Sequence, residues 1–134
     1  MKRKLKDLSD PRVLRAEAAR ASEALDRVVR DREFKSDEEF GEFMQSLVGK
    51  SFDELEMPEL TPRDKAQDLV YDAWEEKSAK RRTEMARKAL ELWPDCADAY
   101  CVLAEEATTS DEERRMLEAA VAAGERAIGP EPFK

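Results

Sequence analysis

Apolar side chains recur along the chain at the spacing of one helix face, and this pattern predicts a helical protein. A first helix is expected over residues 11–32, where a heptad-like seam favours packing within the domain over dimerisation. A second helix is expected over residues 37–48, and its aromatic stripe is interpreted as part of the core. The seam of the first helix consists of Leu14, Ala18, Ala21, Leu25 and Val28.

Four further helices are expected after a connector at residues 49–61. In the last of them the apolar face runs from Met116 to Ile128, and Leu117 and Val121 are expected to face inward. The chain has no strand-like alternation of apolar and polar residues, so the expected fold class is all-α. These helices are expected at about 62–77, 79–93, 96–107 and 111–128.

Residues that suit helix ends stand at the expected boundaries. Oxygen-bearing side chains before each helix can accept hydrogen bonds from free backbone N–H groups. Ser36 and Ser110 are each followed three residues later by glutamate, the spacing of a capping box. Gly49 and Gly129 are placed to adopt positive φ after a helix. The expected N-cap residues are Asp10, Ser36, Thr61, Asp95 and Ser110.

The second half of the chain contains a repeat. The apolar pattern that begins at Ala66 recurs 34 residues later, from Tyr100. The run Lys88-Ala89-Leu90 matches Arg126-Ala127-Ile128 at an offset of 38 residues. A helix pair of this length leaves one apolar face open, and a second pair stacked on it closes that face.

The run Lys88-Ala89-Leu90-Glu91-Leu92-Trp93-Pro94-Asp95 resembles the K-A-L-E-L-x-P-x ending of a tetratricopeptide repeat, and residues 98–104 resemble the opening of the next repeat. Within residues 63–130, which carry this resemblance, some segments are also similar to largely unannotated bacterial proteins with such repeats. The resemblance implies helical hairpins stacked as a short TPR-like α-solenoid with an N-terminal helical pair. The expected single domain, residues 1–134, divides into the pair and connector at 10–60 and two repeat units at 61–134.

In the tetratricopeptide family the first helix of each unit lines a concave groove that binds peptides, so the resemblance implies a protein or peptide partner. Some members clamp a terminal carboxylate with lysine, arginine and asparagine, and those residues are absent here, so that ligand is not expected. Two units would form a short groove with a small binding footprint. The implied groove residues are Gln67, Tyr71, Trp74, Cys101, Glu105 and Thr108.

The composition points away from catalysis. The 134 residues include no histidine, which excludes Ser-His-Asp and Cys-His catalysis and histidine metal sites. The two cysteines, Cys96 and Cys101, are expected to diverge around a helix and to form neither a disulfide nor a metal site. We therefore expect no catalytic residue, no metal and no cofactor.

Charge is unevenly distributed along the chain. The net charge of −8 disfavours nucleic acid as a partner, yet residues 77–88 carry six basic side chains and one acidic side chain. This run is interpreted as a solvated helix face paired with nearby carboxylates, or as a patch for an acidic partner. The patch residues are Lys77, Lys80, Arg81, Arg82, Arg87 and Lys88.

These observations favour a non-enzymatic protein–protein interaction module in the cytoplasm, with no membrane contact. Because the last helix pair has no capping neighbour, an exposed apolar face predicts self-association as a homo-oligomer. The alternative is an enzyme or small-molecule-binding protein with a pocket between the N-terminal helices and the repeats. Tyr71, Trp74 and the basic run would then be the candidate ligand-binding residues.

Overall fold

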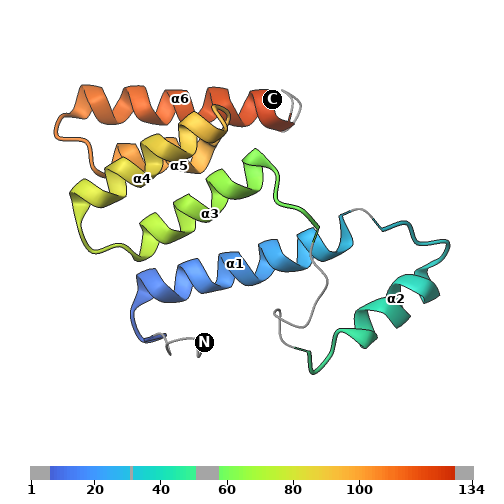
Figure 1. Cartoon of the computed structure of the whole chain (residues 1–134). Helices are drawn as coiled ribbons and strands as arrows, with labels where there is room; N and C mark the ends of the chain where they lie inside the picture. Colours follow the sequence, from blue (N-terminus) through green and yellow to red (C-terminus); the bar gives the residue numbers. More distant parts are fainter. Residues whose placement is uncertain (1–6, 31, 51–57, 129–134) are drawn as a thin grey trace. The chain divides into compact units, whose positions relative to one another are not determined.

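The computed structural model describes residues 7–30, 32–50 and 58–128, and every regular element in them is a helix. The expected all-α fold class is therefore confirmed (Figure 1). The expected helix end at Gly129 and the connector residues 51–57 lie outside the described residues. The helices are α1 (Pro11–Val29), α2 (Asp37–Ser46), α3 (Pro62–Glu75), α4 (Ala79–Leu92), α5 (Ala97–Glu105) and α6 (Ser110–Ile128).

The chain divides into two compact units. The first comprises Met1–Ala18 and Leu60–Lys134, and the second comprises Ala19–Glu59. Helix α1 contributes its first turns to the first unit and its remaining turns to the second. The single domain expected over residues 1–134 stays a prediction.

Short-range aromatic contacts organise the second unit. The ring of Phe34 lies edge-on to Phe40, with 5.1 Å between ring centroids, and 5.4 Å from the ring of Phe43. The guanidinium of Arg32 lies 4.3 Å above the Phe43 ring. Helix α2 contains no buried residue, so the interpretation of its aromatic stripe as core is wrong. The rings pack on a neighbour close in sequence instead.

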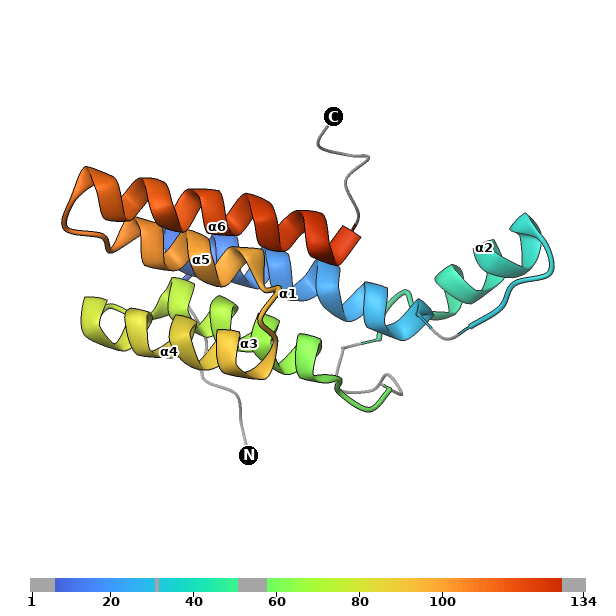
Figure 2. The same cartoon turned by 90° about the horizontal axis from the view of Figure 1, so that it is seen from above.

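Two helical hairpins form most of the first unit. Helix α3 packs against α4 and α5 against α6, while α4 and α3 also contact α5. Seen from above, the α3–α4 pair and the α5–α6 pair lie in two adjacent layers (Figure 2). Apolar residues of α3, α4 and α5 are thus buried where the two hairpins meet, as the stacking of helix pairs predicted.

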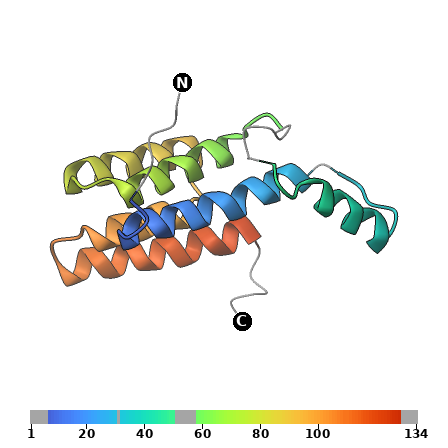
Figure 3. The ribbon, with the colours of Figure 1, turned by 90° about the horizontal axis from the view of Figure 1, so that it is seen from below.

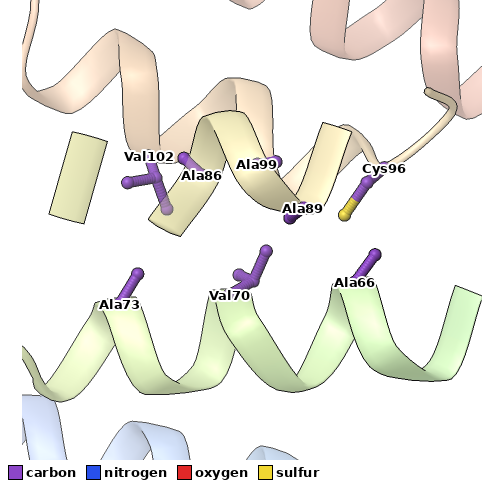
Figure 4. Close-up of a cluster of buried hydrophobic side chains, with 8 residues drawn as sticks. All are labelled: Ala66, Val70, Ala73, Ala86, Ala89, Cys96, Ala99 and Val102. Carbon is purple, nitrogen blue, oxygen red and sulfur yellow. The ribbon is translucent and has the colours of Figure 1, made fainter. Parts of the chain in front are cut away.

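Small side chains build the core between the hairpins. Alanines of α3 and α4 face one another around Val70, and Val102 closes the cluster from α5 (Figure 4). Because alanine has no side chain beyond Cβ, the helices approach closely, and larger side chains such as Trp74 and Trp93 pack around the rim. The buried cluster consists of Ala66, Val70, Ala73, Ala86, Ala89, Cys96, Ala99 and Val102.

Three of the expected N-caps are confirmed. The Asp10 carboxylate accepts a hydrogen bond from the Arg12 N–H at 2.9 Å, and Ser36 accepts one from Glu39 at 3.1 Å. Thr61 and Asp64 form a reciprocal capping box before α3. These bonds join residues two or three positions apart, which is why the sequence alone predicts them.

Two expected caps are wrong. Cys96, rather than Asp95, precedes α5 and makes no side-chain cap bond. The Asp95 carboxylate accepts a bond from Arg126 Nε at 2.7 Å instead, which ties the loop to the end of α6. At the start of α6 the hydroxyl of Thr109, not Ser110, accepts the Glu112 N–H at 3.1 Å.

The structure also corrects the faces assigned to α1 and α6. In the first turns of α1 the buried residue is Ala16, whereas Leu14 is exposed, so the heptad-like seam is not the buried stripe there. In α6 the buried residues are Ala120 and Ala123. The alanines face α5 because the close helix approach favours small side chains, and the larger apolar residues of α6 are left on the outer side.

Candidate functional site

The first turns of α1 bring two arginines to the ends of α3 and α5. The first turns of α1, up to Ala18, lie beside α3 on the side away from α4 (Figure 1), and Figure 3 shows the ribbon from below. The Arg15 guanidinium lies 4.0 Å above the Trp74 ring and 4.0 Å from the Glu105 carboxylate. Arg12 Nη1 donates to the carbonyl oxygen of Glu76 at 3.4 Å. Two arginines on consecutive turns of α1 thus face the carboxyl ends of two other helices.

A third arginine reaches the same place from the first turn of α4. Arg82 Nε donates to Glu106 Oε1 at 2.7 Å, and this bond raises the pKa of Arg82. Its Nη1 donates to the carbonyl oxygens of Glu76 at 2.8 Å and Lys77 at 3.0 Å. These carbonyls follow the end of α3, where backbone oxygens lack helical partners.

The three arginines surround a small cavity, which we call the arginine cavity. Its volume is about 160 Å³. A single water needs about 10–15 Å³ of such space, so the cavity takes a group of several heavy atoms. Its lining residues are Arg12, Arg15, Trp74, Arg82, Val102 and Glu105.

The six residues of the implied groove are in different surroundings. Trp74 and Glu105 line the arginine cavity, where Arg15 contacts both. Tyr71 is buried, and its ring centroid lies 5.3 Å from that of Trp74. Gln67 joins α3 to α5, because its Nε2 donates a hydrogen bond to the Asp98 carboxylate at 2.8 Å. Cys101 is half-buried on α5, whereas Thr108 is exposed in the loop that follows.

The basic patch separates into two parts. Arg82 turns toward α5 and is partly buried beside Glu106. The other five residues are exposed. Those within α4 lie on the same side of the helix as the acidic side chain of Glu84. This mixture of charges matches a solvated face better than a uniform surface for an acidic partner. The exposed patch residues are Lys77, Lys80, Arg81, Arg87 and Lys88.

Helix α6 presents an apolar stripe on its outer side, which we call the α6 stripe. Leu117, Val121 and Ile128 recur at helical spacing and expose 45%, 51% and 60% of their surface. A shallow hollow of about 370 Å³ lies over the first two of them, flanked by Glu113 and Arg114.

Both cysteines are free thiols, and burial raises the pKa of each. Cys96 is fully buried, with its Sγ 4.0 Å from the side-chain oxygen of Gln67. Among the described residues, no group of three or more cysteine, aspartate or glutamate side chains is arranged to hold a metal ion. No described helix is both long and apolar enough to cross a membrane.

We expect the two thiols to differ in their reaction with iodoacetamide. The thiolate is the reactive form, and a raised pKa lowers its fraction at neutral pH, so both should react more slowly than a cysteine peptide and should speed up only at higher pH. Half-buried Cys101 should be modified first, and Cys96 after unfolding in urea. Mass spectrometry of digests reads each site separately, and faster labelling of Cys96 in the native chain would contradict this burial.

Arg12 and Arg15 are the site residues that sequence reasoning missed. The apolar seam through Leu14 predicts that a different face of α1 packs on the rest of the chain. A usable signal was Ala16, a small residue that follows the two arginines on the same side of the helix. The aliphatic part of an arginine side chain can pack on an aromatic ring while its guanidinium stays accessible. A helix face with two arginines and an alanine can therefore be partly buried.

Comparison with known proteins gives the family. Residues 46–130 match the model of the ST7 protein family. The suppressor of tumorigenicity 7 protein-like proteins of Bos taurus and Homo sapiens are each 48% identical to the chain over 58 residues, and that of Gallus gallus is 45% identical. The matched segment covers 42% of this chain and 10% of each relative, so the chain spans a small part of their length. No solved structure matches the chain.

The interpretation of the chain as similar to bacterial tetratricopeptide-repeat proteins is therefore wrong. The matching family model is that of the ST7 protein, and the relatives are animal proteins named after it. The run at residues 88–95 is an amphipathic helix end followed by proline, and many helical hairpins share that pattern. The matched region covers more than half of the chain. The chain therefore belongs to the ST7 protein family.

Proposed function

We propose that the chain is a non-enzymatic protein–protein interaction module that binds a partner through the α6 stripe. The observation that carries the proposal is the exposure of Leu117, Val121 and Ile128 along one side of a helix. The stripe lies within the segment that matches the ST7 family. Single exposed apolar residues are common on proteins, whereas several aligned on one helix favour docking.

An amphipathic helix of a protein or peptide partner is the occupant that suits this surface. Two helices pack when the apolar ridges of one enter the grooves of the other. The shallow hollow over Leu117 and Val121 lies on α6 alone and suits a ridge of apolar side chains from a partner helix. Glu113, Arg114 and Glu118 around it carry charges of both signs. A second copy of the chain could supply the same kind of helix, which would make the module self-associating.

We expect the double variant Leu117→Gln/Val121→Gln to lose partner binding. Glutamine keeps the helix, but it removes two apolar side chains from the stripe. Burial of two half-exposed residues contributes roughly 2 kcal/mol, so binding should weaken about tenfold or more. Light scattering measures self-association, and crosslinked pull-down with mass spectrometry identifies other partners.

The matched control is Leu92→Gln, which replaces a 39% exposed leucine on α4 away from the stripe. This variant should bind like the wild type. A partner counts only if the double variant loses it and the control retains it. Equal binding by the wild type, the double variant and the control would refute the proposal. So would a wild type that forms no oligomer and yields no crosslinked partner.

A cytoplasmic location is also proposed. A reducing compartment keeps cysteines as thiols, and Cys96 and Cys101 are free in the structure. Expression of a fluorescent fusion of the chain tests the location, and an extracytoplasmic signal would contradict it.

The arginine cavity favours a second candidate function, the binding of a small molecule. It lies where the start of α1 meets the two hairpins, and Trp74 and Arg82 are both in its wall. A ligand that binds the folded chain raises its melting temperature. A thermal-shift screen with anionic metabolites tests this function, and the absence of any stabilising compound would contradict it.

A further inference from the structure

We propose that the arginine cavity binds a phosphate-type oxyanion, either as a free phosphate compound or as a phosphorylated side chain. This inference rests on the second candidate function, because it names the chemical class of the ligand for the same cavity. The cavity lies within the first unit, since Arg12 and Arg15 precede Ala19 and the other lining residues follow Leu60.

Two of the three guanidinium groups already have more than one partner before any ligand arrives. Arg15 rests on the Trp74 ring at 4.0 Å, and Arg82 is fixed through Nε and Nη1 by Glu106 and two backbone carbonyls. Arg82 also lines the cavity, and its Nη2 remains as a further donor. Side chains that are already ordered lose little conformational freedom on binding, which favours affinity.

The lining of the cavity is net positive, although the chain as a whole carries −8. Glu106 balances Arg82 at 2.7 Å, and Arg12 donates to a neutral carbonyl. The contact between Arg15 and Glu105 is 4.0 Å long, and both side chains are 56% exposed, so solvent screens this pair strongly. The lining itself holds three arginines and one carboxylate, that of Glu105, whereas the carboxylates of Glu106 and Glu76 act on Arg82 from outside the lining.

The number of donors selects the ligand class. A carboxylate is satisfied by one arginine in a bidentate pair, whereas a tetrahedral phosphate dianion presents acceptor oxygens in several directions. Three guanidinium groups that approach from α1 and α4 therefore match a phosphate better than a carboxylate. The volume of about 160 Å³ has room for such a group together with bound water.

The two tryptophans provide a local measurement. Trp74 lines the cavity, whereas Trp93 lies elsewhere, with Arg63 5.1 Å from its ring. In a ¹⁵N NMR titration, inorganic phosphate should shift the Trp74 indole resonance and leave that of Trp93 unchanged, with sodium chloride of equal ionic strength as the blank. Trp93→Phe assigns the two signals. O-phosphoserine and a phosphoserine peptide, each against its unphosphorylated form, then distinguish a free compound from a phosphorylated partner.

The variant Arg12→Gln/Arg15→Gln should raise the Kd for phosphate at least tenfold. Arg87→Gln/Lys88→Gln makes the same change in net charge on the exposed face of α4 and should leave the Kd within twofold of the wild type. Equal losses in the two variants would mean nonspecific charge attraction and would overturn the proposal, as would a Trp74 signal that no phosphate compound moves. A further outcome is that another class of small molecule binds instead and loses affinity in the Arg12→Gln/Arg15→Gln variant. That result would contradict phosphate as the ligand but would support small-molecule binding in the cavity, the second candidate function.

Discussion

Replacing Val70 by aspartate is expected to remove most of the stability of the first unit. Val70 is fully buried among the alanines of α3 and α4, and Val102 is also in the cluster. A carboxylate in that position would have only apolar neighbours from the cluster, and an uncompensated buried charge costs about 3–5 kcal/mol. Domains are stable by only about 5–15 kcal/mol, so the loss is a large fraction of the total. Urea unfolding followed by circular dichroism measures it.

The matched control for this substitution is Leu14→Asp. Leu14 also lies within a helix of the first unit, but 52% of its surface is exposed, so the new carboxylate remains hydrated. We expect a change of about 0.5 kcal/mol in the free energy of unfolding, as for ordinary surface positions. A similar loss in both variants would show that helix propensity, and not burial at Val70, controls the effect.

The local features of this fold follow from the sequence. The capping box of Thr61 and Asp64 joins residues three positions apart, so its pattern is visible without tertiary information. The same holds for Asp10, whose carboxylate accepts the N–H of Arg12. Local signals of this kind located the starts of α1, α2 and α3.

Cap signals were less informative where a tertiary contact competed for the side chain. Asp95 resembles an N-cap in sequence, but its carboxylate pairs with Arg126 from the far end of α6. The arginine belongs to the following helix, and only folding brings it near. A sequence pattern cannot decide between a weak local bond and a charged partner of this kind.

The assignment of buried faces failed where alanine and larger apolar residues shared one helix. In α6 a wide apolar arc includes both Ala120 and Val121, and the sequence does not say which side meets α5. The structure buries the alanine at 8% exposure and leaves the valine at 51%. Close approach of α5 and α6 favours the smaller side chain, and that distance is a tertiary property.

The candidate site was partly predictable for the same reason. Residue type indicates Trp74 and Arg82, because one is an aromatic residue at a helix end and the other belongs to a basic run. Residue type does not indicate Arg12 and Arg15, because their role depends on the packing of α1 near Trp74 and Glu105. Convergence from separate helices is a consequence of topology and leaves no spacing signal in the chain.

Replacing Arg82 by alanine is the second large effect that we expect. Arg82 and Glu106 expose only 12% and 18% of their side chains, and the arginine also binds two carbonyls after α3. Alanine leaves a partly buried carboxylate and both carbonyls without this donor, at a cost of about 2–3 kcal/mol. Arg82→Lys should lose less, although a lysine cannot reproduce the planar arrangement of guanidinium donors. Urea unfolding measures both variants.

A neighbouring residue provides the control for Arg82. Arg81 precedes it in the same helix turn but is exposed, so Arg81→Ala should change the free energy of unfolding by about 0.5 kcal/mol or less. A double-mutant cycle with Glu106→Ala then isolates the contact, because the two single losses should exceed the loss in the double variant. Strictly additive losses would mean that Arg82 stabilises the unit through the α3 carbonyls alone, and that the 2.7 Å pair with Glu106 contributes nothing to joining α4 and α5.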